Sequence, residues 1–213
     1  MQEFQCFSVE LQDHIAHVIL SRPDQFNSMN KVFWQELPLC LREIEASGDA
    51  RVVVISSTGK HFSAGMDLAV FSDPKAVPMT GDPGRMAENL RRVVLQLQNS
   101  LSILEQVRLP VLVAIQGGCI GGALDMVCAA DCRYASEDAY FTIKETELGM
   151  TADVGTLQRL PKLIAPGVVR ELDYTRRKFS AQAAMQFGIV QQVFASPPWM
   201  LAAVLSKGHK LAA

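Results

Sequence analysis

Residues 116–153 read QGGCIGGALDMVCAADCRYASEDAYFTIKETELGMTAD. In this stretch two glycine pairs, at 117–118 and 121–122, lead from the apolar run 111–115 into a helical pattern at 123–130. The order of strand, glycine turn and helix is typical of an α/β protein. Glycine pairs also allow a backbone to come close to another group, so this turn is the first candidate for a functional site.

Three acids accompany the glycines in an otherwise apolar context: Asp125, Glu145 and Asp153. Bare N–H groups at the start of a helix stabilise a negative oxygen, and carboxylates beside that oxygen can move protons. N–H donors and neighbouring carboxylates are the groups needed to form an enolate and then to protonate it. Each acid also has a structural interpretation, as a helix-start charge, a solvated strand-end charge and a helix N-cap respectively. The glycines could serve only strand-to-helix packing, so the hypothesis depends on the combination.

A second glycine-bearing loop, 58–67, follows the β-branched run 52–55, which reads as a buried strand. The N–H of Met66 in this loop could face the same point as the amides of the first turn, and two donors would make an oxyanion hole. The alternative is an ordinary turn in which Asp67 caps the next helix.

The rest of the chain alternates between the periodicities of strands and helices, which places it in the α/β class. The predicted strands are 7–11, 15–20, 51–57, 111–115, 132–135, 140–143 and 189–194. The predicted helices are 30–47, 85–107, 123–130, a helix capped by Asp153 or Thr156 that ends before Pro161, 166–174, 181–187 and one after Pro198. We expect a core domain at 1–195 and the start of a C-terminal helical region at 196–213.

Two segments carry further expectations. The leucine-rich stripe of the helix 85–107, which includes Leu90, Leu97, Leu101 and Leu104, predicts core packing along its length. The segment 73–84 collects three prolines and two glycines, which indicates an irregular surface segment that could flank a substrate entrance.

Composition excludes several classes of function. The chain has 213 residues, 49% of them hydrophobic, which is enough for a sizeable core. Its formal charge is −2, with 20 basic and 22 acidic residues scattered along it, so no basic face indicates nucleic acid or an anionic membrane. No apolar run approaches the length of a membrane span, and residues 1–10 resemble neither a signal peptide nor a transit peptide.

Five cysteines form an odd set without a C-x-x-C pair, which favours reduced thiols in a reducing compartment. The four histidines are dispersed and offer no metal-ligand spacing, so no metal site and no protein-bound cofactor is predicted.

Four segments together resemble the enoyl-CoA hydratase/isomerase (crotonase) superfamily. Residues 62–68, FSAGMDL, are similar to its F-x-A-G-x-D-L loop. Residues 114–125 resemble its A-I-x-G-x-x-x-G-G segment, 130–135 its A-x-D-x-R-x-A strand, and 22–28 its R-P-x-x-x-N-A start. The resemblance runs from about residue 7 to 194 and lies in an ordered set of motifs.

The resemblance implies a spiral of strand-strand-helix turns, a coenzyme A thioester as substrate, and homotrimers or homohexamers. It assigns the oxyanion donors to the N–H groups of Met66 and Gly122, and places the adenine of coenzyme A against the backbone of Ala64 and Met66. Ala123 stands where many members have a third glycine. Members usually continue into C-terminal helices that cover the acyl pocket, whereas this sequence stops at Ala213. The chain is therefore either truncated, given without its tail, or a shortened member of the family. Mitochondrial or peroxisomal localisation follows from the family, with the cytosol left open.

The acids decide the reaction within this superfamily. Hydratases carry two glutamates at the positions matched by Asp125 and Glu145, and usually a Pro-Gly pair near the position of Asp153. The present trio resembles the Δ3,5-Δ2,4-dienoyl-CoA isomerase branch instead. Moving the diene transfers hydrogen from C2 to C6, a separation that favours two acid-base groups. The resemblance favours Asp153 as base and Glu145 as acid, with Asp125 assisting.

We expect an apolar pocket to hold the acyl chain and to raise the carboxylate pKa values by desolvation. Its candidate lining residues are Leu124, Met126, Leu148 and Met150, each of which could equally belong to the plain core. Two alternatives remain: an enoyl-CoA hydratase that uses Asp125 and Glu145, and a non-catalytic crotonase-like protein that binds RNA or acts as an assembly subunit.

Overall fold

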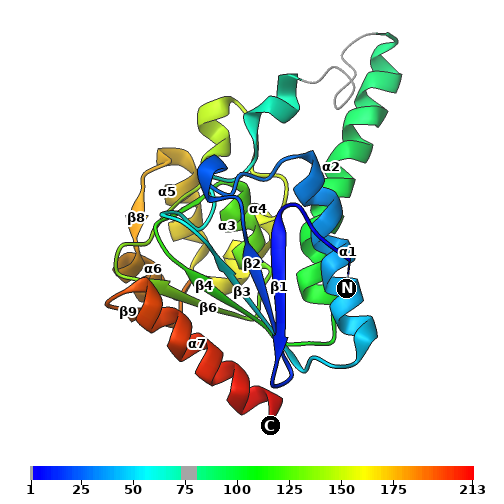
Figure 1. Ribbon diagram of the computed structural model, residues 1–213. Helices are drawn as coiled ribbons and strands as arrows, with labels where there is room; N and C mark the ends of the chain where they lie inside the picture. The colour runs from blue at the N-terminus through cyan, green and yellow to red at the C-terminus, as the bar shows by residue number, and fades with distance from the viewer. Residues whose placement is uncertain (1, 73–80) are drawn as a thin grey trace.

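The computed structural model describes residues 2–72 and 81–213, which form two β-sheets surrounded by helices (Figure 1). The larger sheet has six strands in the order β1-β2-β3-β4-β6-β9, and the smaller has three in the order β5-β7-β8. The strands are β1 Phe7–Gln12, β2 Ile15–Leu20, β3 Val52–Ser57, β4 Val111–Ile115, β5 Gly118–Ile120, β6 Cys132–Ser136, β7 Tyr140–Thr142, β8 Phe179–Ser180 and β9 Gln192–Phe194. The helices are α1 Lys31–Ser47, α2 Pro83–Gln106, α3 Gly122–Cys128, α4 Thr156–Leu163, α5 Pro166–Thr175, α6 Ala181–Phe187 and α7 Pro197–Ala212.

The larger sheet begins with an antiparallel hairpin and continues in parallel. β1 and β2 pair antiparallel around Asp13 and His14, both of which have positive φ, as a tight hairpin turn requires. β2, β3, β4, β6 and β9 then pair in parallel. Parallel strands are covered on both faces, which explains why β3 and β4 are continuous apolar runs rather than alternating ones.

The two faces of this sheet are covered by different helices (Figure 1). On one face Ile15, Val54 and Leu112 form a cluster with Met200 and Val204 of α7. On the other face Val53 and Ile55 belong to a larger core that includes buried side chains of α1, α2 and α3. The predicted final helix thus completes a second hydrophobic layer.

Most of the predicted elements are confirmed, including the long helix with an internal proline. Asn30 caps α1 by accepting a hydrogen bond from the N–H of Phe33, and the helix continues through Pro38 to a left-handed Gly48. The last predicted strand, 189–194, is shorter than expected. Ile189 and Val190 are buried, but only residues 192–194 pair with β6, because the apolar pattern reports burial rather than hydrogen bonding.

The prediction that the leucine stripe of α2 packs into the core is wrong for its first half. Leu101 and Leu104 are buried, but Leu90 is 48% exposed, because α2 projects beyond the body of the protein at its N-terminal end (Figure 1). The predicted irregular segment 73–84 lies largely outside the described residues, apart from 81–84, where Asp82 caps α2 through the N–H of Arg85. Among the described residues, no helix is both long and apolar enough to cross a membrane.

Candidate active site

The first component of the site is the turn from β5 into α3. Gly121 precedes the helix with φ +51°, a conformation that L-residues rarely adopt. Its own N–H donates to the carbonyl of Thr142, which anchors the turn to the end of β7. Gly122 is the first residue of α3, so its N–H has no intrahelical acceptor, and no other backbone acceptor for it is found in residues 2–72 and 81–213.

The second component is the loop after β3, which lies against this turn. Ser63 pairs in parallel with Cys119 of β5, and Met66 pairs with Met29. The pairing uses the N–H of Met29 and the carbonyl of Gly65, which leaves the Met66 N–H facing away from Met29 and without a backbone acceptor within the described parts of the chain. Gly65 has φ +80° and packs so tightly that a Cβ there would lie 2.3 Å from the carbonyl oxygen of Ile120.

The amides of Met66 and Gly122 are neighbours. A Cβ placed on Gly122 would lie 3.5 Å from the Met66 nitrogen, and one placed on Gly65 would lie 3.1 Å from the Gly122 nitrogen. Two adjacent N–H groups without internal acceptors can serve one anionic oxygen, with the positive end of the α3 dipole adding to the field. The third predicted substrate-binding residue, Ala64, donates its own N–H to the carbonyl of Phe26.

Sequence reasoning did not identify the apolar wall beside these amides. The Met29 sulfur and the Trp34 ring lie 3.2 and 3.8 Å from the position of a Cβ on Gly122. Trp34 is fixed because its indole N–H donates to the Met29 carbonyl at 3.0 Å. Both residues look like core in the sequence, so only their place beside Gly122 distinguishes them.

Asp125 lies on α3, one turn beyond the free amide of Gly122, and is fully buried. Its Oδ1 accepts a hydrogen bond from the N–H of Thr156, while Oδ2 has no partner among the described residues. Burial raises the pKa of Asp125 to about 6, and the charge of Asp153 adds to the rise, against the hydrogen bond from Thr156. At neutral pH a carboxyl group with this pKa is mostly ionised, with a minor protonated fraction.

The hydrogen bond from Thr156 corrects a prediction about α4. We expected Asp153 or Thr156 to cap this helix, but the N-cap is Gly155, which has no side chain. The N–H of Thr156 is satisfied instead by Asp125, 31 residues earlier in the sequence. Pro161, predicted to follow the helix, lies within it. A cap supplied from another element leaves no local pattern in the sequence.

Glu145 begins the 3₁₀ turn η3 (Glu145–Leu148), which follows β7. Its Oε2 accepts the N–H of Lys144 at 2.8 Å, and its Oε1 would lie 2.9 Å from a Cβ on Gly121, so the carboxyl group rests on the glycine turn. Burial raises the pKa of Glu145 to about 7, and the negative charge of Asp125 contributes. A carboxyl group with this pKa can both hold and release a proton at neutral pH.

Asp153 lies in the loop before α4 and is half-buried. Its N–H donates to the carbonyl of Thr151 at 2.8 Å, and its own carbonyl accepts a hydrogen bond from Gln98 of α2 at 2.6 Å. Burial raises the pKa of its carboxyl group. Gln98 was not identified from the sequence, because the Asp153 carbonyl to which it donates lies 55 positions away in the chain.

The predicted lining residues divide into two groups. Leu124 and Met126 are fully buried in the core around α3. Leu148 is 46% exposed, and Met150 is partly buried, so both lie nearer the surface on the loop that follows Glu145.

All five cysteines are free thiols, four of them buried. Burial raises the pKa of the Cys40 and Cys128 thiols to about 12, which makes them unreactive structural residues. In the described ranges, no group of His, Cys, Asp and Glu side chains is arranged to hold a metal ion.

A comparison with protein families matches residues 10–212 to the enoyl-CoA hydratase/isomerase family. The chain belongs to this family. It is 44% identical over 196 residues to the human mitochondrial Δ3,5-Δ2,4-dienoyl-CoA isomerase, covering 92% of this chain and 60% of that protein. It is 42% identical over 183 residues to the peroxisomal isomerase of Arabidopsis thaliana, covering 85% of this chain and 66% of that one. The chain thus spans about 60% of the length of the mammalian relatives.

Solved structures of the family share the fold. An enoyl-CoA hydratase from Bacillus anthracis has a TM-score of 0.84 at 31% identity, covering 98% of this chain and 77% of that chain. An enoyl-CoA hydratase/isomerase from Marinobacter aquaeolei has a TM-score of 0.87 at 22% identity, with the same coverage, and shows the fold alone. The predicted α/β, crotonase-like fold class is confirmed, and so is the resemblance to the dienoyl-CoA isomerase branch.

Proposed function

We propose that this protein is an isomerase that converts 3,5-dienoyl-CoA to 2,4-dienoyl-CoA. The observation that carries the proposal is a third carboxylate, the half-buried Asp153, whose charge acts on the buried Asp125, which in turn acts on the half-buried Glu145 beside the glycine turn. Relatives that are 42–44% identical carry the name of this isomerase, which supports the same activity here.

In the proposed reaction, the thioester oxygen accepts hydrogen bonds from the amides of Met66 and Gly122. Asp153 takes a proton from C2, and the electron pair delocalises through the diene onto that oxygen, forming a dienolate. Glu145 then gives a proton to C6, the electrons return, and double bonds remain at C2 and C4. One well-placed donor to such an oxyanion contributes about 10²- to 10³-fold in rate.

Burial supports this division of roles. Glu145 has a pKa of about 7, so it retains a proton at neutral pH in a large fraction of molecules, as an acid must. Asp153 is less buried than Asp125 and contacts the chain mainly through its backbone, which leaves its carboxylate available as a base. Asp125 is held by Thr156 and assists through its charge, which raises the pKa of Glu145.

The second candidate is an enoyl-CoA hydratase, favoured by the proximity of Asp125 and Glu145, which could activate water without Asp153. Asp153→Asn separates the two. The isomerase predicts that the variant loses about 10²- to 10⁴-fold in diene isomerisation, followed by the ultraviolet absorbance of the conjugated thioester. Near wild-type isomerisation in the variant, or hydration of a 2-enoyl thioester as the faster wild-type reaction, would reject the isomerase proposal.

The wider setting is also proposed by resemblance. The relatives are named as mitochondrial or peroxisomal, which supports an organelle. A step in fatty acid β-oxidation is proposed from the family resemblance alone. We further propose that the adenine of coenzyme A lies against the backbone of Ala64 and Met66, that no additional cofactor is used, and that the protein assembles as a homotrimer or homohexamer. Light scattering of the purified protein tests the assembly directly.

A further inference from the structure

Arg159 is a buried arginine that the proposed reaction does not use. It lies on α4 and is only 9% exposed, and its Nε and Nη2 atoms donate to one carboxylate oxygen of Glu105 on α2, at 2.9 and 2.6 Å. Nη2 also donates to the Ser102 hydroxyl at 2.9 Å. Removing a guanidinium from water costs free energy that its ion pair only partly offsets, so stability alone does not explain this position.

The remaining nitrogen of Arg159, Nη1, faces the loop before α4, residues 153–155. It donates to the carbonyl of Val154 at 3.4 Å, and a Cβ placed on Gly155 would lie 2.0 Å from it. Gly155 also has φ +152°, a conformation that L side chains rarely adopt. Glycine at this position therefore allows the guanidinium to lie directly against the loop.

Gln98 holds the same loop from α2. Its Nε2 donates to the carbonyl of Asp153 at 2.6 Å. Gln98, Ser102 and Glu105 are four and three positions apart, so they lie on one face of α2. The face of α2 that binds Arg159 is thus the face that binds the loop, and two consecutive carbonyls of the loop are fixed by side chains from outside it.

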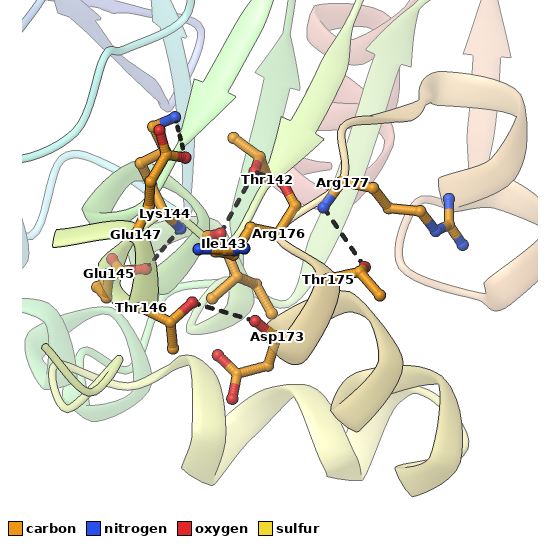
Figure 2. A network of polar contacts seen from close by, with 10 residues as sticks. All are labelled: Thr142, Ile143, Lys144, Glu145, Thr146, Glu147, Asp173, Thr175, Arg176 and Arg177. Atoms are coloured by element: carbon orange, nitrogen blue, oxygen red, sulfur yellow. Dashed lines mark hydrogen bonds and ion pairs between the residues drawn. The ribbon is translucent and has the colours of Figure 1, made fainter. Parts of the chain in front are cut away.

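Glu145, the acid of the proposed reaction, is held by a different helix (Figure 2). Before it in the chain, the Thr142 hydroxyl donates to the carbonyl of Arg176 at 3.1 Å. After it, the Thr146 hydroxyl donates to the carbonyl of Asp173, also at 3.1 Å. Both acceptors lie at the end of α5. The acid is therefore positioned from α5, whereas the base is positioned from α2 and α4.

We propose that Arg159 is a positioning residue for Asp153: together with Gln98, it fixes the peptide groups of the loop, so that the carboxylate base keeps a constant place relative to C2 of the substrate. This role rests on the proposed isomerase function. The order that Arg159 imposes on the loop does not, since it is a property of the folded protein alone.

The test is Arg159→Lys, which keeps the charge but loses the planar fork that bonds to α2 and to the loop together. We expect kcat for diene isomerisation to fall about 10- to 10²-fold with little change in KM, because a displaced base reacts more slowly. Deuterium at C2 of the substrate should slow this variant by a larger factor than it slows the wild type, since removal of the C2 proton becomes the slow step.

A second measurement does not depend on catalysis. The N–H of Thr156, next to the loop, donates to Asp125, so the hydrogen exchange of this amide reports the order of the loop. Arg159→Lys should speed exchange at Thr156 and leave the amides of β4 unchanged. Gln98→Met removes the other donor to the loop, and it should change kcat and the exchange in the same directions. It also serves as the test if Arg159→Lys does not fold.

Arg177→Lys is the matched control. Arg177 also donates through Nε and Nη2 to a carboxylate, that of Glu171 on α5, at 2.7 and 2.9 Å. These bonds do not involve the loop before α4, and both side chains are 43% exposed. The control should change neither kcat, nor the C2 isotope effect, nor the exchange at Thr156.

The possible failures are distinguishable. In an active enzyme, an unchanged kcat in Arg159→Lys overturns the inference, and so does a lower kcat without a larger C2 isotope effect. Unchanged exchange at Thr156 overturns it whether or not the enzyme is active. An inactive wild-type protein in which the variant still speeds this exchange would overturn the isomerase proposal and leave the ordering of the loop by Arg159 supported.

Discussion

The six-stranded sheet and the acidic layer beside it differ in how their buried polar groups are hydrogen-bonded. In the sheet, buried polar groups are paired: the His17 ring bonds to the Ser56 hydroxyl at 2.8 Å, and Arg133 donates to the carbonyl of Ile189 at 2.6 Å. In the acidic layer, formed by α3, η3, the loop before α4 and α5, Asp125 and Asp173 each bury an oxygen without a partner in the described parts of the chain.

This difference indicates that one region provides stability and the other provides groups for proton transfer. The sheet and its helices supply the free energy of folding through apolar burial. Holding carboxyl groups out of water in the acidic layer lowers the stability of the folded protein, and it gives these groups pKa values suited to proton transfer. Substitutions in the two regions should therefore have opposite signs in a stability measurement.

The largest effect is expected in the apolar core. Phe33 is 1% exposed and contacts Phe7 at a ring-centroid distance of 5.1 Å. Phe33→Ala removes the buried ring and leaves a cavity, so the free energy of unfolding should fall by about 3–5 kcal/mol. Urea denaturation measures this loss of unfolding free energy. A loss below about 1 kcal/mol would contradict the view that apolar burial in this core supplies the stability of the protein.

The next effect should appear in catalysis, at the junction of the two regions. Gly65→Ala places a Cβ 2.3 Å from the Ile120 carbonyl, which must move the adjacent Met66 amide. We expect kcat to fall by about 10²- to 10³-fold, the contribution of one oxyanion donor.

Gly48→Ala is the control for this substitution, because Gly48 also has positive φ but no atom within 4 Å of its Cβ position. It should lower stability slightly and leave kcat unchanged. Equal losses of kcat in both variants would attribute the effect to backbone strain rather than to the amide.

In the acidic layer, removing a side-chain charge should raise the free energy of unfolding instead of lowering it. The pKa of Glu145 is raised from 4.5 to about 7 in the folded protein, so the folded state holds this proton to higher pH than the unfolded chain. Its contribution to stability is present below pH 4.5 and is lost as the pH rises through about 7. Glu145→Gln removes the charge, and at pH 8 it should raise the free energy of unfolding by about 1–2 kcal/mol.

Chemical denaturation at pH 8 and pH 4.5 measures this gain, which should nearly vanish at the lower pH. A loss of stability at pH 8 would mean that the Glu145 carboxylate is well solvated or paired, and it would remove the contrast between the two regions.

The smallest effect should come from a helix cap on the sheet side. Asn30 accepts the N–H of Phe33 at 2.9 Å, so Asn30→Ala should cost about 1 kcal/mol in thermal or urea unfolding. Ser196 occupies the N-cap of α7 without a side-chain hydrogen bond. Ser196→Ala should therefore be nearly neutral, and a similar cost for both would show that capping is not the cause.

Local sequence patterns predicted the elements of this protein but not all of their environments. The Asn30 cap and the glycine turn before α3 were predicted because both depend on residues within a few positions. The burial of the α2 stripe was predicted wrongly at Leu90, since periodicity identifies an apolar face but not what covers it.

The sequence by itself determined the α/β alternation, the two glycine-bearing loops and the trio Asp125, Glu145 and Asp153, because each is encoded in periodicity or in an ordered motif. Only the tertiary structure decided that Asp125 caps α4, that Gln98 holds the loop of Asp153, and that Asp173 lies beside the Glu145 turn. These arrangements join residues 27 to 55 positions apart. Desolvation and charge act through space, so no local pattern in the chain can encode them.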